Sequence, residues 1–131
     1  YLSNIMFSKG IFTFLDSIAG VFDFDSSVKV IIAGDFLSDE FYTADETRRM
    51  FFNRFNALKN KYPNVSLTYM GVLRGSDKVK ILESSSVFVL PTFYGPEAMP
   101  ISIIEAMVCG NVIVTTNHNF LSSLGRLNTK L

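Results

Sequence analysis

The sequence predicts an α/β fold built on an open parallel sheet, and three observations indicate it. Short runs of β-branched residues occur at 28–33 and 87–90, and each ends in a turn signal that contains Gly34 in the first case and Pro91 in the second. These runs are apolar without alternation, as strands are when helices cover both faces of a parallel sheet. Helical patterns separate the runs, so the connections should be right-handed crossovers of a Rossmann-like fold.

Strands and helices alternate along the whole chain. One helix is indicated by Phe51 and Phe55 at helical spacing, with acidic residues before them and basic residues after them, which suits the helix dipole. Pro100 fits the first position of another helix and Gly110 fits its end. The expected elements are a strand before Asn4, a helix from Lys9 to Val21, strand Val28–Ala33, the helix through Phe51 and Tyr62, strand Val65–Met70, a helix from the N-cap Ser76 to Leu82, strand Val87–Leu90, helix Pro100–Cys109 and strand Val112–Thr115.

Length and composition limit the possible functions. A chain of 131 residues is the size of one domain, and 48% hydrophobic residues are enough for a core. Twelve basic residues balance twelve acidic ones, so the chain lacks the positive charge expected of a nucleic-acid-binding protein. The apolar runs are too short to predict a membrane-spanning segment, and the single Cys109 favours a reducing, cytoplasmic location.

The loop at 91–100 is the strongest candidate for a site, because ligands of open parallel sheets bind beyond the carboxyl ends of the strands. It leads into a helix start, where free amides, the small Ala98 and the Ser102 hydroxyl would suit phosphate oxygens. Glu105 lies in an apolar part of that helix, so its carboxylate needs hydrogen-bond donors, such as ribose hydroxyls. The alternative is a Glu105 that turns to solvent or accepts from a backbone amide.

Several motifs in series resemble one enzyme family. The run Val87–Thr92, then Glu97, Pro100-Ile101-Ser102, Glu105-Ala106-Met107 and Gly110 is similar to the signature of family 4 retaining glycosyltransferases, which have the GT-B fold. Glu97 and Glu105 match the two glutamates that this family places eight positions apart. The resemblance continues upstream through Ser8-Lys9-Gly10, Ile31–Asp35 and Asn64-Val65 with Gly71.

The resemblance implies a role for each matching residue. Glu97 would lie beside the donor sugar at the reacting centre, Lys9 would offset charge on the diphosphate leaving group, and Glu105 would bind the ribose. Donor-binding roles extend to the base-docking and phosphate-binding regions, which comprise Gly71, Val72, Ala98, Met99, Pro100, Ile101, Ser102, Gly10 and Asn4. Asn4 stands where the family often has an arginine, and Ala98-Met99 replace a more usual Gly-Phe.

The resemblance also implies a function. Residues 1–131 would form the C-terminal, donor-binding domain of a GT-B enzyme, truncated at both ends, which binds a UDP-sugar or GDP-sugar without a metal or other cofactor. The acceptor would be held by a missing N-terminal domain, so the chain alone should transfer nothing. The full enzyme would be cytoplasmic or peripheral to a membrane. Two alternatives are a degenerate, non-catalytic domain of the same fold and a flavodoxin-like interaction module.

Two further features carry less weight. His118 is either an ordinary loop histidine or a phosphate ligand, since it follows a predicted strand. Asp23-Phe24-Asp25 is similar to the metal-binding motif of a different glycosyltransferase fold, but it lies between a helix end and a strand start. A turn is therefore the preferred interpretation of the aspartates.

Overall fold

The computed structural model describes residues 1–119 and 121–124 and confirms the α/β fold. A short 3₁₀ turn, η1, precedes the alternating helices and strands. In chain order the elements are η1 (Phe7–Lys9), α1 (Ile11–Phe24), β1 (Lys29–Ile32), α2 (Ala44–Lys61), β2 (Ser66–Tyr69), α3 (Gly75–Glu83), β3 (Val87–Leu90), α4 (Ile101–Val108), β4 (Val112–Thr115) and α5 (Leu121–Leu124).

The strands form two small parallel sheets, not the single sheet that was expected. β1 pairs with β2, and β3 pairs with β4. The strand predicted at the chain start forms only two isolated bridges, Leu2 with Ala33 and Ile5 with Phe36. It pairs with residues that follow β1 and then turns into η1, so no continuous ladder joins the two sheets in the described part of the chain.

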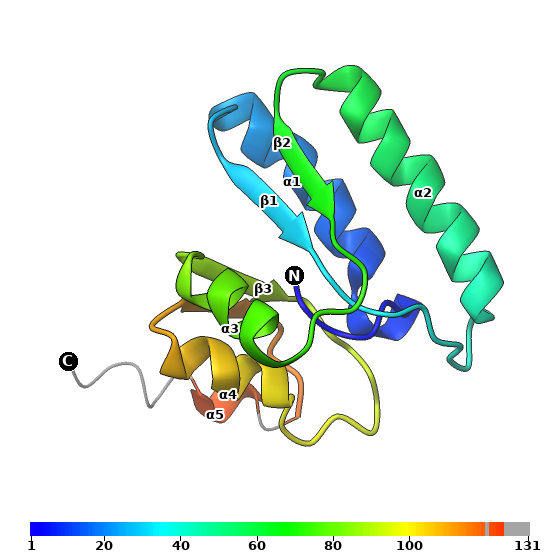
Figure 1. Cartoon of the computed structure of the whole chain (residues 1–131). Coiled ribbons are helices and arrows are strands. Elements are labelled where there is room, and N and C mark those ends of the chain that lie inside the picture. The colour runs from blue at the N-terminus through cyan, green and yellow to red at the C-terminus, as the bar shows by residue number, and fades with distance from the viewer. Residues whose placement is uncertain (120, 125–131) are drawn as a thin grey trace.

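The N-terminal segment nevertheless connects the sheets through close backbone contacts, and it lies between β1 and β3 (Figure 1). Gly34 (φ 150°) lies so close to Ser3 that a Cβ would be 1.8 Å from the Ser3 carbonyl oxygen. At Gly10 (φ 75°), a Cβ would likewise lie 2.0 Å from the Pro91 carbonyl oxygen. Only glycine fits both the positive φ and the contact at these positions.

Helices cover the sheets unevenly. Phe51 and Phe55 of α2 are buried, as are Ile11 and Leu15 of α1, and these two helices lie beside β1 and β2 (Figure 1). The edge strand β4 is more open, with Val112 exposed to 63%. The expectation that helices cover both faces of every strand is therefore wrong for β4. Among the described residues, no helix combines the length and apolar character needed to cross a bilayer.

The helix ends agree with the sequence in part. Thr43 and Glu46 form a reciprocal capping box at the start of α2, and Lys59 and Lys61 lie in its last turn. Ser76 is not an N-cap, because α3 begins at Gly75 and its N-cap is Arg74, two residues earlier than predicted. Pro100 precedes α4 as its N-cap instead of opening it, and α1 begins at Ile11, two residues later than predicted.

Asp39 ties the loop before α2 to the start of the chain. Its Oδ2 accepts from the amide and the hydroxyl of Ser8 at 2.8 and 2.7 Å, and its Oδ1 accepts from the amides of Phe41 and Tyr42 at 2.9 and 3.0 Å. Burial works to raise the pKa of Asp39, but the bonds from Ser8, Tyr42 and Phe41 outweigh it and lower the pKa below its usual value.

The contact at Gly10 predicts opposite effects for two glycine substitutions. Gly10→Ala should lower the free energy of unfolding by about 2 kcal/mol or more, because alanine meets both the positive φ and the Pro91 carbonyl. Gly20→Ala is the control, since Gly20 is an exposed position of α1 with open space around it, and it should raise stability by about 0.5–1 kcal/mol. Urea unfolding measures the free energy of unfolding of both variants, and equal changes in the two would contradict the prediction.

The bonds to Asp39 predict a pH-dependent contribution to stability. Because the folded pKa lies below the unfolded one, the contribution is complete above about pH 4 and is lost as the pH falls through the folded pKa. Asp39→Asn should therefore destabilise the chain by about 1–3 kcal/mol at pH 7, and the difference should shrink at pH 3. Asp16→Asn, which breaks an exposed ion pair with Arg54, should cost less than about 1 kcal/mol. A difference for Asp39→Asn that persists at pH 3 in urea titrations would disprove the linkage.

Candidate functional site

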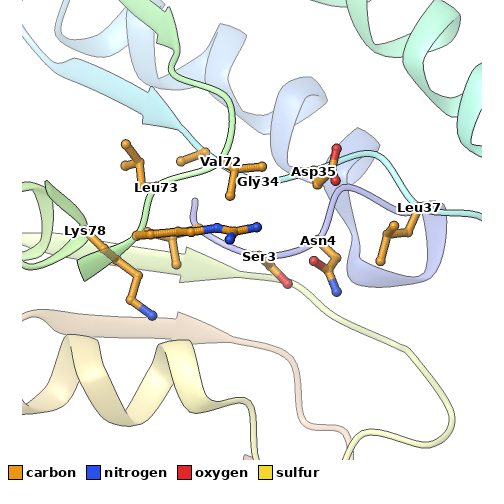
Figure 2. Close-up of a pocket in the computed structure, with 11 residues that line it drawn as sticks. Ser3, Asn4, Gly34, Asp35, Leu37, Val72, Leu73 and Lys78 are labelled. Atoms are coloured by element: carbon orange, nitrogen blue, oxygen red, sulfur yellow. The ribbon is translucent and has the colours of Figure 1, made fainter.

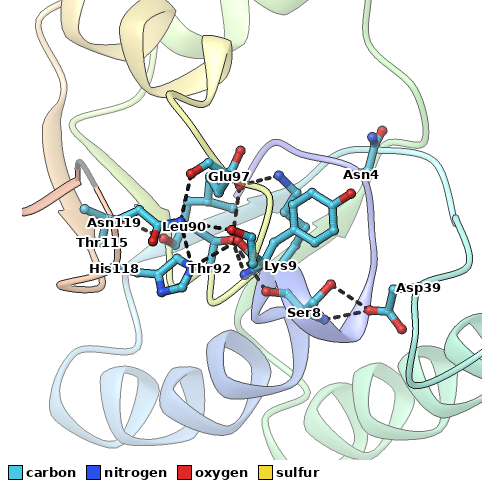
Figure 3. A network of polar contacts seen from close by, with 12 residues as sticks. Asn4, Ser8, Lys9, Asp39, Leu90, Thr92, Glu97, Thr115, His118 and Asn119 are labelled. Atoms are coloured by element: carbon cyan, nitrogen blue, oxygen red, sulfur yellow. Dashed lines mark hydrogen bonds and ion pairs between the residues drawn. The ribbon is translucent and has the colours of Figure 1, made fainter.

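A buried ion pair joins the two segments that the sequence singled out. The ammonium of Lys9, in η1, donates to Oε2 of Glu97 in the β3–α4 loop, and both residues are 9% exposed (Figure 3). The Thr92 hydroxyl lies 3.2 Å from the same carboxylate oxygen, and the Tyr94 ring centroid lies 4.8 Å from the Lys9 ammonium. Lys9 is therefore not a solvated lysine at a helix start.

The surroundings of the ion pair are largely buried. The Tyr1 phenol donates to the carbonyl oxygens of Lys9 and Asn4, both at 3.3 Å. Burial, and then the charge of Glu97, raise the pKa of this phenol well above its usual range. Thr92 is fully buried. Charges in such a setting interact more strongly with one another, and with any bound ion, than they would in water.

A pocket lies beyond the carboxyl ends of β1 and β2, where the fold predicts a ligand site. Its volume is about 270 Å³, and its lining includes Asn4, Asp35, Val72, Arg74 and Lys78. Figure 2 shows Lys78 at one end of the pocket, with Asn4 and Asp35 toward the other end. The walls therefore come from the N-terminal segment, from the residues after β1 and from the start of α3.

Glu105 of α4 is linked to this pocket by Lys78. The Lys78 ammonium lies 2.6 Å from Oε1 of Glu105. The other carboxylate oxygen, Oε2, is buried and has no hydrogen-bond partner among the described residues. Glu105 is thus neither turned fully to solvent nor bonded to a neighbouring amide, and its buried Oε2 lacks a hydrogen-bond donor among the described residues.

The start of α4 lies between Glu97 and Glu105 in the chain and has the free end that was expected. Pro100 is its N-cap and makes no side-chain capping bond. Ile101 is 71% exposed, Ala98 is exposed, and Met99 and Ser102 are half-buried. The first amides of α4 are therefore not capped by the side chain that precedes them.

The remaining predicted donor residues fall into two groups. Asn4 and Val72 are exposed and line the pocket, and the carbonyl of Gly71 accepts from the amide of Gly34 at 2.8 Å beside it. Gly10 differs, because it is buried, its N–H donates to Phe7 and its carbonyl accepts from Phe14. In the structure Gly10 has a packing role. Its predicted role in binding the donor remains a prediction.

His118 and the two aspartates of Asp23-Phe24-Asp25 all make hydrogen-bond contacts within the chain. His118 lies with its Nε2 3.0 Å from the Tyr94 carbonyl oxygen, so the ring holds the loop that contains Glu97. Asp25 accepts from the amide and hydroxyl of Ser27, and Asp23 accepts from Tyr62, which fits the turn interpretation. No group of three or more potential metal ligands occurs in the described ranges.

Four residues that contact the site were not predicted to do so. Thr92 was only part of a motif, and Asp39 was noted only for its charge before a helix. Lys78 had a readable signal, since a cation in the first turn of α3 is poorly placed relative to the helix dipole. Asn119 had one too, because asparagine tolerates the left-handed conformation it adopts after β4, with φ 49°.

Comparison with known families gives one match. The family model of the glycosyl transferases group 1 matches residues 1–127. No curated protein and no solved structure gives a significant match. The family match covers nearly the whole chain, including the Lys9–Glu97 pair, the pocket and α4. The chain therefore belongs to the group 1 glycosyl transferases, which transfer a glycosyl group from a donor to an acceptor.

Proposed function

We propose that this chain binds a nucleoside-diphosphate sugar as the donor half of a retaining glycosyltransferase. The observation that carries the proposal is the series of polar contacts that links the pocket to the loop before α4. Lys78 lines the pocket and pairs with Glu105 of α4, and the loop that leads into α4 carries Glu97, which pairs with Lys9. A base, a ribose, a diphosphate and a sugar follow one another in the same order in an extended donor.

Glu105 suits the ribose for a specific reason. The buried Oε2 has lost its hydrogen bonds to water and has formed none within the described residues, so its desolvation free energy is not compensated. A ribose diol would donate to the carboxylate of Glu105, which Lys78 also contacts. Lys78 also compensates the negative charge of Glu105, which would otherwise repel a diphosphate nearby.

The diphosphate would be bound by two positive features. One is the uncapped N-terminus of α4, whose amides and helix dipole favour anions. The other is Lys9, whose ammonium has three donors and gives one to Glu97. In the transfer step the diphosphate leaves with extra negative charge, and a positive charge fixed beforehand in a dry site stabilises that transition state.

Glu97 would then contact the sugar. Its carboxylate is fixed by Lys9 and Thr92, so it meets the sugar in one orientation without reorganisation. We propose a UDP-sugar or GDP-sugar donor without a metal, retention of anomeric configuration, and an acceptor held by a second domain, so residues 1–131 alone should bind donor without efficient transfer. A cytoplasmic location remains a prediction. The family match does not favour a flavodoxin-like module.

Calorimetric titration with UDP, GDP, ADP and their glucose or mannose conjugates tests the proposal. The chain should bind one base in preference to the others, and Glu105→Gln should weaken that binding about tenfold or more, because an amide accepts the ribose bonds poorly. Glu83→Gln, an exposed position on α3, is the matched control and should leave the Kd unchanged. No binding by the wild-type chain, or equal affinity of Glu105→Gln, would refute the ribose assignment.

The ion pair permits a test that separates stability from binding. Lys9→Met alone should lower the free energy of unfolding by about 3–5 kcal/mol, since it leaves Glu97 buried and unpaired. The double variant Lys9→Met/Glu97→Gln removes both charges and should recover most of that stability, as thermal denaturation would show. It should still bind the nucleoside diphosphate at least about tenfold more weakly. Recovery of stability together with wild-type affinity would exclude Lys9 from the diphosphate site.

A further inference from the structure

The loop from Pro91 to Pro100 that carries Glu97 has little regular structure, and its carbonyls are bonded by side chains that follow β4 (Figure 3). The β3–β4 ladder ends where Leu90 faces Thr115. At this pair the Thr115 hydroxyl donates to the Leu90 carbonyl at 2.8 Å, and beyond it the Thr116 hydroxyl donates to the Thr92 carbonyl. Side chains therefore continue the pairing that the backbone has stopped.

The same pattern extends to Glu97 itself. His118 Nε2 lies 3.0 Å from the Tyr94 carbonyl oxygen and 3.2 Å from the Asn119 amide nitrogen. The Asn119 amide donates to the carbonyls of Gly95 at 3.1 Å and Glu97 at 2.9 Å. We call the side chains of Thr115, Thr116, His118 and Asn119 the β4 clamp.

We infer that Asn119 and His118 are positioning residues for Glu97, an inference that rests on the proposed function because it requires Glu97 to face the donor sugar. Glu97 is held at three points: Asn119 binds its carbonyl, the Tyr94 carbonyl accepts from its amide at 3.0 Å, and Lys9 binds its carboxylate. Loss of the clamp would free the backbone while leaving the ion pair, so the carboxylate would lose its fixed direction.

The chemistry of Asn119 fits this role and few other residues would. Its φ of 49° is a conformation that glycine and asparagine tolerate best. Its amide supplies two N–H donors for two carbonyls, whereas aspartate would present only acceptors and glycine would present no side chain at all. The turn after β4 thus carries a side chain that holds the loop.

The test compares two ligands in one variant. Asn119→Gly keeps the left-handed conformation and removes the clamp bonds. It should raise the Kd for the nucleotide sugar about tenfold, while the Kd for the matching nucleoside diphosphate, which does not reach Glu97, should change by less than about twofold. Asn117→Ala, an exposed position in the same turn, is the control and should change neither. Equal weakening of both ligands, or of neither, would overturn the inference.

A second measurement needs no ligand. Amide hydrogen exchange at Glu97 should accelerate at least about tenfold in Asn119→Gly, while exchange in α2 stays unchanged. Unaltered exchange at Glu97 would show that the clamp does not hold the loop. If Asn119→Gly does not fold, His118→Ala, which removes only the bond to Tyr94, gives the same comparison. If the wild-type chain binds UDP or GDP but does not bind the corresponding nucleotide sugars, the inference about Asn119 and His118 is overturned. If the wild-type chain binds none of these ligands, the proposed function itself is wrong.

Discussion

The buried ion pair between Lys9 and Glu97 is the interaction on which the site depends. It joins residues 88 positions apart and links the N-terminal turn to the loop before α4. Burying two charges is costly unless they meet each other and further hydrogen-bond partners, and Thr92 supplies such a partner. The pair contributes less to overall stability than to the definition of one geometry, since either charge alone would be strongly unfavourable there.

The rest of the N-terminal half is arranged so that Lys9 can reach Glu97. Asp39 holds the amide of Ser8, and the Ser8 carbonyl accepts from the amide of Phe93 at 2.8 Å. Gly10 then lets the backbone turn against Pro91 without a Cβ in the way. Each of these contacts fixes a residue next to Lys9 or next to Thr92. The two small sheets are therefore joined at the position where the charges meet, although no ladder connects them.

The sequence was sufficient for the elements and insufficient for their contacts. Runs such as Val87–Leu90 are local signals, and the structure has that strand with the same bounds. The spacing of Glu97 and Glu105 is local as well. The pairing of Lys9 with Glu97, and of Lys78 with Glu105, depends on how distant segments pack, which no periodicity contains. The open β4 edge and the missing first strand were mispredicted for the same reason, because strand pairing is a tertiary property.

The ion pair also bears on how an anion would be accommodated in the proposed function. An ammonium has three donors, and Lys9 uses one for Glu97 while its other side faces the Tyr94 ring. A phosphate oxygen that approached Lys9 would therefore share it with Glu97 instead of replacing that carboxylate. Sharing leaves Glu97 fixed but places two negative groups around one cation, so the helix dipole of α4 has to supply the remaining positive potential. In the proposed function, the loop that carries Glu97 therefore leads directly into α4, whose uncapped first amides begin only a few residues after the carboxylate.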